Sequence, residues 1–180
     1  MLTVAIIGAG PLGRRLALAA ARAGLRVFLE DVMPANLHHA RESIRQHLGP
    51  EALPAVTFVS TIEDAVRQAD LVVDCVPDEL ESKLEILWLL DRMAPPRTIF
   101  ATPTMHLSAD DLAACTYRPQ QCIAIAAAPT DFAGETTGAL RLLAAAATSD
   151  ATIGAATSFF AQLGFTPVVE RSSVSFPARV

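Results

Sequence analysis

The chain has 180 residues, a net charge of −5, 52% hydrophobic residues and 18% charged residues. This length suits one domain with a sizeable core, and this composition excludes a disordered or fibrous chain. The sequence has no basic cluster and no run of about 18 uncharged apolar residues, so we expect neither a nucleic-acid partner nor a membrane span. Cys75, Cys115 and Cys122 form no C-x-x-C pair. We therefore expect buried, reduced thiols in a cytoplasmic protein without a signal peptide.

Short apolar runs alternate with helical patterns along the chain. A strand over 2–7, a helix over 14–22 and a strand over 26–29 make one βαβ unit. Further helices are expected over 34–48, from Ser60 or Thr61 to 69, over 77–93, after a cap at Ser108, and over 150–163. Further strands are expected over 56–59, 71–76, 98–101, 122–127 and 166–169, whereas 140–146 fits a strand or a helix.

This alternation predicts an α/β fold with a doubly wound parallel sheet of the Rossmann type. We expect a single domain over 1–180, with a short tail over 172–180. On the helix expected over 77–93, four leucines recur at helical spacing and are predicted to lie along one side: Leu80, Leu84, Leu87 and Leu90.

The turn after the first predicted strand is rich in glycine. Gly8 permits a tight turn, Gly10 lets a pyrophosphate approach the backbone, and Gly13 allows the helix to pack closely on the strand. The following helix offers unpaired N–H groups and the positive end of its dipole to phosphate. We therefore predict a dinucleotide site in this turn, formed by Gly8, Ala9, Gly10, Pro11, Leu12 and Gly13.

An acid follows the glycine turn at the end of the second predicted strand. Asp31 lies about 20 residues after Gly10, the spacing of an acid that binds the adenosine ribose hydroxyls. No Lys or Arg occupies 32–34 to neutralise a 2′-phosphate, so NAD is favoured over NADP. Glu30 is the alternative ribose acid, which strand alternation disfavours. The competing interpretation is a turn that serves packing alone, with Asp31 as a helix cap.

The whole chain resembles the NAD-binding domain of the 3-hydroxyacyl-CoA dehydrogenase family. The resemblance rests on VAIIGAGPLGRRLALAAARAG, ADLVVDCVPDELESK, IFATPTMHLS, RPQQCIAI, AATSD and LGFTPVV, in the family's order. It implies a Rossmann fold, NAD as cofactor, an oxidoreductase of fatty acid metabolism and an acyl-CoA as a candidate partner.

The resemblance adds residues to the cofactor site. Asp78 stands where the family has a glutamate near the cofactor, and Lys83 stands where it has a lysine in the same region. Val76, in the same segment, completes the predicted cofactor-binding set. Otherwise Asp78 complements the dipole of the next helix, and Lys83 is a solvated helix position.

The family's catalytic residues are absent from this alignment. Its catalytic histidine falls on Ala126, the asparagine after it on Pro129, and the glutamate that orients the histidine on Gly138. Its substrate-contacting serine falls on Met105, and the asparagine of its N-T-S-S stretch falls on Pro103. The resemblance thus implies that the cofactor-binding residues are retained and the catalytic residues are missing.

Nearby side chains do not restore the catalytic pair. Glu135 lies close to the orienting position, but a carboxylate without an imidazole does not make the general base. His106 follows Met105 and can face the same crevice, yet a lone histidine is more often structural. Three histidines of the second helix lack partners for a metal: His38, His39 and His47. We predict no catalytic residue and no metal ligand.

The family's second, helical domain is missing from the sequence. Only the arginine of the family's junction survives within 173–179, and we expect a natural single-domain protein. The sequence predicts an NAD(H)-binding protein that is inactive alone. The alternatives are a dehydrogenase completed by a partner chain and a non-catalytic module that senses or binds NAD.

Without that second domain, an apolar face is expected to lie open to solvent. Because such a face usually marks a contact, we predict a homodimer or a partner chain there. The residues expected on this face are Ala126, Ala127, Ala128, Phe132 and Phe176.

Overall fold

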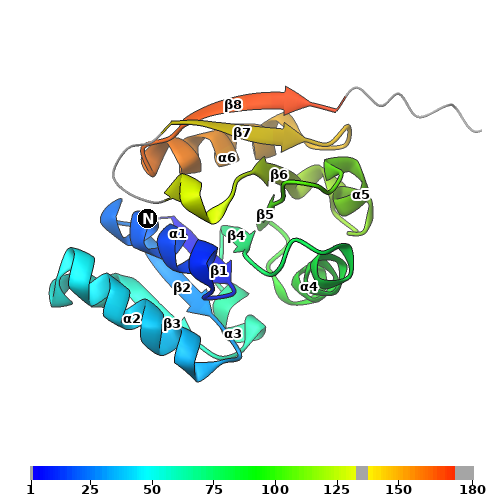
Figure 1. Cartoon of the computed structure of the whole chain (residues 1–180). Helices are drawn as coiled ribbons and strands as arrows, with labels where there is room; N and C mark the ends of the chain where they lie inside the picture. Colours follow the sequence, from blue (N-terminus) through cyan, green and yellow to red (C-terminus); the bar gives the residue numbers. More distant parts are fainter. Residues whose placement is uncertain (1, 133–137, 173–180) are drawn as a thin grey trace, which may run out of the picture.

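Eight strands form one sheet in the order β3-β2-β1-β4-β5-β6-β7-β8 (Figure 1). The computed structural model describes residues 2–132 and 138–172. The strands are β1 Thr3–Ile7, β2 Arg26–Glu30, β3 Val56–Val59, β4 Leu71–Asp74, β5 Ile99–Pro103, β6 Cys122–Ala126, β7 Ala139–Ala144 and β8 Thr166–Arg171. The α-helices are α1 Pro11–Arg22, α2 Pro34–Leu48, α3 Ile62–Val66, α4 Leu80–Met93, α5 Ala109–Ala114 and α6 Asp150–Gln162.

The sheet changes direction between β1 and β4. From β1 the chain runs outward through β2 to β3, and it then returns to pair β4 with β1 before it continues to β5 and β6. All these pairs are parallel, which confirms the predicted doubly wound Rossmann fold. One departure lies at the far edge, where β7 runs antiparallel to β6 and β8 runs parallel to β7.

Helices cover both faces of the sheet and enclose two cores (Figure 1). Because strand side chains alternate, Ile6 packs on the side of α1, α2 and α6, whereas Ile7 packs on the side of α3, α4 and α5. Leu16, Phe160 and Leu87 are among the fully buried side chains contributed by the helices. Burial of each such side chain contributes roughly 1.5–3 kcal/mol.

The predicted helix caps are present at two short helices. The Thr61 hydroxyl accepts from the backbone N–H of Asp64 at 3.2 Å, and the Ser108 hydroxyl accepts from that of Asp111 at 3.3 Å. Helix α3 ends at Val66, earlier than the expected residue 69. The segment over 140–146, ambiguous by periodicity, contains the strand β7.

Helix α4 begins at Leu80 instead of residue 77, and its buried side differs from the leucine pattern. The buried residues are Lys83, Leu87 and Leu90, whereas Leu80 is 49% exposed. The helix is therefore rotated so that a lysine takes the inner position of its first turn.

The three cysteines differ in their burial. Cys122 is buried and Cys75 partly so, but Cys115 is exposed, which corrects the expectation of three buried thiols. Within the ranges that the structure describes, no helix is long and apolar enough to cross a membrane. The expectations for Glu135, Phe176 and the segment 173–180 lie outside the described residues.

Candidate functional site

A cavity of about 670 Å³ opens at the carboxyl ends of the parallel strands, between the segments that follow β1, β2, β4, β5 and β6. This position is the switch point of the sheet, where doubly wound folds bind their ligands. Seven of the predicted cofactor residues line the cavity: Gly8, Gly10, Pro11, Leu12, Asp31, Val76 and Asp78. The other three are buried and do not line the cavity: Ala9, Gly13 and Lys83.

The three glycines of the turn meet three different steric demands. Gly8 has φ +97°, and a Cβ added there would lie 3.1 Å from the carbonyl oxygen of Cys75. A Cβ on Gly13 would lie 1.8 Å from the Gly8 carbonyl oxygen, so only glycine lets α1 approach β1. Gly10 faces open space, with no atom within 4 Å of an added Cβ, and it stands at the N-cap of α1. This is the free backbone surface that a pyrophosphate needs.

Asp31 is 8% exposed and ties three segments together. Its Oδ2 accepts from the backbone N–H of Ala9 at 2.8 Å and from the Asn36 side-chain amide at 3.0 Å. Its Oδ1 accepts from the backbone N–H of Met33 at 2.7 Å, just before α2. Asp31 therefore braces the glycine turn and the start of α2 while it also lines the cavity.

Asp78 connects two walls of the cavity. Its Oδ2 accepts from the backbone N–H of Met105 at 2.8 Å, which joins the turn after β4 to the loop after β5. Its Oδ1 is buried, and no hydrogen-bond partner lies within reach in the described part of the chain. Asp78 precedes the N-cap of α4, Glu79, so it also lies near the positive end of that helix.

Lys83 forms a buried ion pair instead of reaching the cavity or solvent. Its Nζ donates to Asp74 Oδ1 at 2.9 Å and to the Asp74 carbonyl oxygen at 3.3 Å, and both side chains are 1% exposed. Burial raises the pKa of Asp74, and the Lys83 cation opposes that rise. The solvated alternative for Lys83 is therefore wrong. In the sequence, the position of Lys83 four residues before Leu87 indicates that both side chains lie on the same side of the helix.

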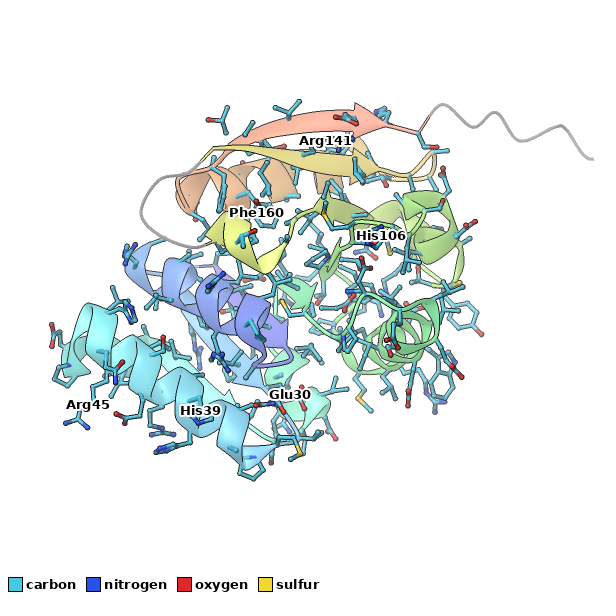
Figure 2. The ribbon with its side chains drawn as sticks, viewed as in Figure 1. Glu30, His39, Arg45, His106, Arg141 and Phe160 are labelled. Carbon is cyan, nitrogen blue, oxygen red and sulfur yellow. The ribbon has the colours of Figure 1, made fainter. Side chains whose placement is uncertain are left out.

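Glu30 lines the cavity, although the sequence predicted it only as the alternative ribose acid. It is 3% exposed, lines the cavity and stands at the end of β2, near α3 (Figure 2). Burial, followed by the charge of Asp31, raises the pKa of Glu30 to about 7, against a smaller lowering by the Gly8 amide. Strand alternation, which disfavoured Glu30 as the ribose acid, aims it instead at the α3 and α4 side.

Cys75 also lines the cavity. Burial raises the pKa of this thiol far above its ordinary value, and the neighbouring Asp74 raises it further. Cys75 is therefore a protonated, weakly nucleophilic group.

The opposite end of the cavity is poor in chemically active groups. Pro103 and Met105 line it where the family has polar residues, and Ala127 and Ala128 follow β6 beside the position of the family's histidine. His106 is exposed and lines the same region (Figure 2). In 2–132 and 138–172 no cluster of three or more His, Cys, Asp or Glu residues is suited to a metal ion.

The expected exposed apolar face is not found at two of its described residues. Ala127 is 4% exposed and Phe132 is 7% exposed, because the segment after β6 folds back onto α1. The ring of Phe132 packs edge-on against that of Phe165, with 5.0 Å between the centroids. The chain thus covers this part of the face by itself.

The fold and the cavity together define a dinucleotide-binding Rossmann domain. Residues 3–173 match the family model described as 3-hydroxyacyl-CoA dehydrogenase, NAD binding domain. The chain therefore belongs to the 3-hydroxyacyl-CoA dehydrogenase family and represents its NAD-binding domain.

Curated relatives and solved structures agree with this assignment. The chain is 30% identical over 133 residues to a probable 3-hydroxybutyryl-CoA dehydrogenase of Bacillus subtilis, covering 67% of this chain and 46% of the relative. It is 36% identical over 130 residues to L-carnitine dehydrogenase of Burkholderia mallei, covering 67% and 40%. The (S)-3-hydroxybutyryl-CoA dehydrogenase of Ralstonia eutropha superposes with a TM-score of 0.86 at 25% identity, covering 95% and 64%. The chain thus spans less than half the length of these two curated relatives.

Proposed function

We propose that this chain binds NAD(H) in preference to NADP(H) and that, alone, it does not oxidise 3-hydroxyacyl-CoA. The observation that carries the first part is Asp31 in the cavity wall, bonded to the glycine turn. A 2′-phosphate on the adenosine ribose would meet Asp31, and no Lys or Arg of the described residues lines the cavity. An acid without a neighbouring cation favours a ribose with free hydroxyls.

The chain's residues divide between the two ends of such a ligand. The glycine turn and the N-terminus of α1 would hold the pyrophosphate, and Asp31 would hold the adenosine ribose. Asp78, Thr104 and His106 would face the nicotinamide end. When bound, NAD supplies hydride transfer; the protein supplies the binding and orientation.

The second part of the proposal rests on the missing general base. A base must lie within hydrogen-bond reach of the proton that it removes, and its loss typically forfeits about 10²–10⁴-fold in rate. Ala126 ends β6 at the position of the family's histidine. His106 is exposed, and no described side chain donates to its ring or accepts from it.

The alternative is an active dehydrogenase completed by a partner chain or by a second copy of this one. It is favoured by the buried Oδ1 of Asp78, which has no hydrogen-bond partner among the described residues. The acyl-CoA substrate would then bind between the two chains. Association would use exposed hydrophobic residues on segments that border the cavity, such as Leu80 and Met105, since Ala127 and Phe132 are covered.

Three measurements test these proposals. Fluorescence titration with NADH and NADPH is expected to give clearly tighter binding of NADH, and equal affinities would refute the preference. Reduction of acetoacetyl-CoA with NADH is expected to be undetectable for the isolated chain, whereas turnover at an ordinary dehydrogenase rate would refute inactivity. Light scattering then reports whether the chain is a dimer, with a monomer at high concentration contradicting self-association.

We also propose a cytoplasmic location. The exposed thiol of Cys115 and the two further free cysteines suit a reducing compartment. Fractionation of cells that express the tagged chain would test this, and recovery outside the cytoplasm would contradict it.

A further inference from the structure

On the side of α3 and α4, the wall of the cavity is mostly apolar. If the pyrophosphate binds at the glycine turn and the ribose at Asp31, the adenine base of the dinucleotide would lie past Asp31. The side chains that line the cavity on the α3 and α4 side are Ile7, Ile62, Val76 and Ile86. Such walls suit a planar aromatic base but provide no hydrogen bond to it.

Glu30 is the exception in this apolar wall. In the sheet it is paired with Ile7 of β1 on one side and with Val59 of β3 on the other. The Glu30 side chain is 3% exposed and lines the cavity. A carboxyl so placed carries a desolvation cost that a hydrogen-bonding ligand would offset.

A comparison with Asp74 makes the position of Glu30 distinctive. Ile7 pairs with Glu30 on one neighbouring strand and with Asp74 on the other, so both acids end their strands on the same face of the sheet. Asp74 has Lys83 as a counter-charge at 2.9 Å. Among the residues that the structure describes, no Lys, Arg or His forms an ion pair with Glu30. Of these two acids, Glu30 is thus the one that faces the cavity and has no cationic partner.

The other polar side chains at this end are already engaged. The Asn36 amide donates to Asp31 Oδ2, and Asp31 also accepts from the backbone of Ala9 and Met33. Glu30 is the acid at this end for which no side-chain partner is found among the described residues; the group that acts on its carboxyl is the backbone amide of Gly8.

We propose that Glu30 is an adenine-recognition residue, one of whose carboxyl oxygens accepts a hydrogen bond from the exocyclic amino group of the base. This inference rests on the proposed dinucleotide binding and adds the selection of the base. Hypoxanthine has a carbonyl oxygen in place of the amino group, so an acceptor would then face the carboxylate. The site would discriminate against the hypoxanthine dinucleotide.

The test compares NADH with its hypoxanthine analogue, deamino-NADH, by fluorescence titration at one pH of about 8. The parent chain is expected to bind NADH about tenfold more tightly than the analogue, as for a hydrogen bond to a charged group. Glu30→Leu should lower this ratio to about one. Glu30→Gln should keep most of it, because the amide oxygen still accepts.

Asp31→Asn provides the matched control. It changes the ribose contact and leaves the base contact intact, so it should weaken both dinucleotides by a similar factor and preserve their ratio. Thermal melting of each variant establishes that it is folded before titration.

The possible outcomes separate this inference from the proposed function. A parent chain that binds both dinucleotides equally, or a Glu30→Leu variant that keeps the parental ratio, would overturn the role of Glu30 and leave dinucleotide binding standing. A parent chain that binds neither would overturn both.

Discussion

The two ends of the cavity are built very differently. On the side of β2, Glu30 and Asp31 bring two carboxyls to the cavity wall, and Asp31 is held by three hydrogen bonds. On the side of β5 and β6, the cavity is lined by Pro103, Ala127 and Ala128, whose side chains have no hydrogen-bonding or ionisable group to offer a substrate. The difference indicates that binding groups and reacting groups can be kept or lost separately on one fold, because they come from different strands.

The largest effect on stability is expected at Lys83, in the buried ion pair with Asp74. Lys83→Met removes the partner of a buried carboxylate and should destabilise the fold by about 3–5 kcal/mol in denaturant unfolding. The double variant Lys83→Met/Asp74→Leu should recover much of this loss, because no unpaired charge remains. A single variant as stable as the parent would show that the pair contributes no net stability.

The second largest effect is expected in the glycine turn, at Gly13. Gly13→Ala places a methyl group 1.8 Å from the Gly8 carbonyl oxygen, and we expect about 1–3 kcal/mol of destabilisation together with loss of NADH binding. Gly10→Ala is the matched control, because its methyl group would enter open space. It should melt like the parent and still bind NADH more weakly. Equal melting of both variants would contradict the packing role of Gly13.

The buried carboxyl of Glu30 predicts a dependence of stability on pH. Its pKa is about 7 in the fold against an ordinary 4.5, so the folded state binds its proton more tightly than the unfolded state. The stabilisation from this group is complete below about pH 4.5 and is lost as pH rises through about 7, with a total of about 3 kcal/mol. The other ionisable side chains that line the cavity are Asp31, Cys75, Asp78 and His106.

Glu30→Gln should remove this component and leave the free energy of unfolding flatter between about pH 5 and pH 8. Denaturant unfolding at several pH values measures it. Identical slopes for the parent and the variant would mean that Glu30 does not titrate in this range.

The smallest effect is expected at the ribose acid. Asp31→Ala should weaken NADH binding by at least several-fold, roughly 1 kcal/mol or more. It should also narrow the difference in affinity between NADH and NADPH, because the acid no longer faces the 2′ position. Titration of both cofactors measures the gap. An unchanged ratio would place the discrimination at Glu30 instead.

The sequence predicted those parts of the site that depend on neighbours close along the chain. The Gly8-to-Gly13 turn and the acid after the next strand belong to one βαβ unit, so their spacing alone carries their geometry. The caps at Thr61 and Ser108 are equally local. These elements were found where they were expected.

The remaining features depend on how distant segments pack, which spacing does not record. Lys83 pairs with Asp74 only because α4 is rotated to bury its first turn. The bond from Met105 to Asp78 requires the loops after β4 and β5 to meet. The antiparallel strand β7 and the burial of Phe132 follow from the return of the chain after β6, for which the sequence carries no local signal.

The hydrogen bond from Ala9 to Asp31 has a consequence for the thermodynamics of binding. It joins the glycine turn to the end of β2 within the protein itself, so the turn is ordered when the chain folds. The backbone entropy of that ordering is therefore lost before a ligand arrives, and binding does not have to supply it. A single buried carboxylate thus makes the phosphate-binding loop a preorganised, rigid surface whose affinity depends on the stability of the fold.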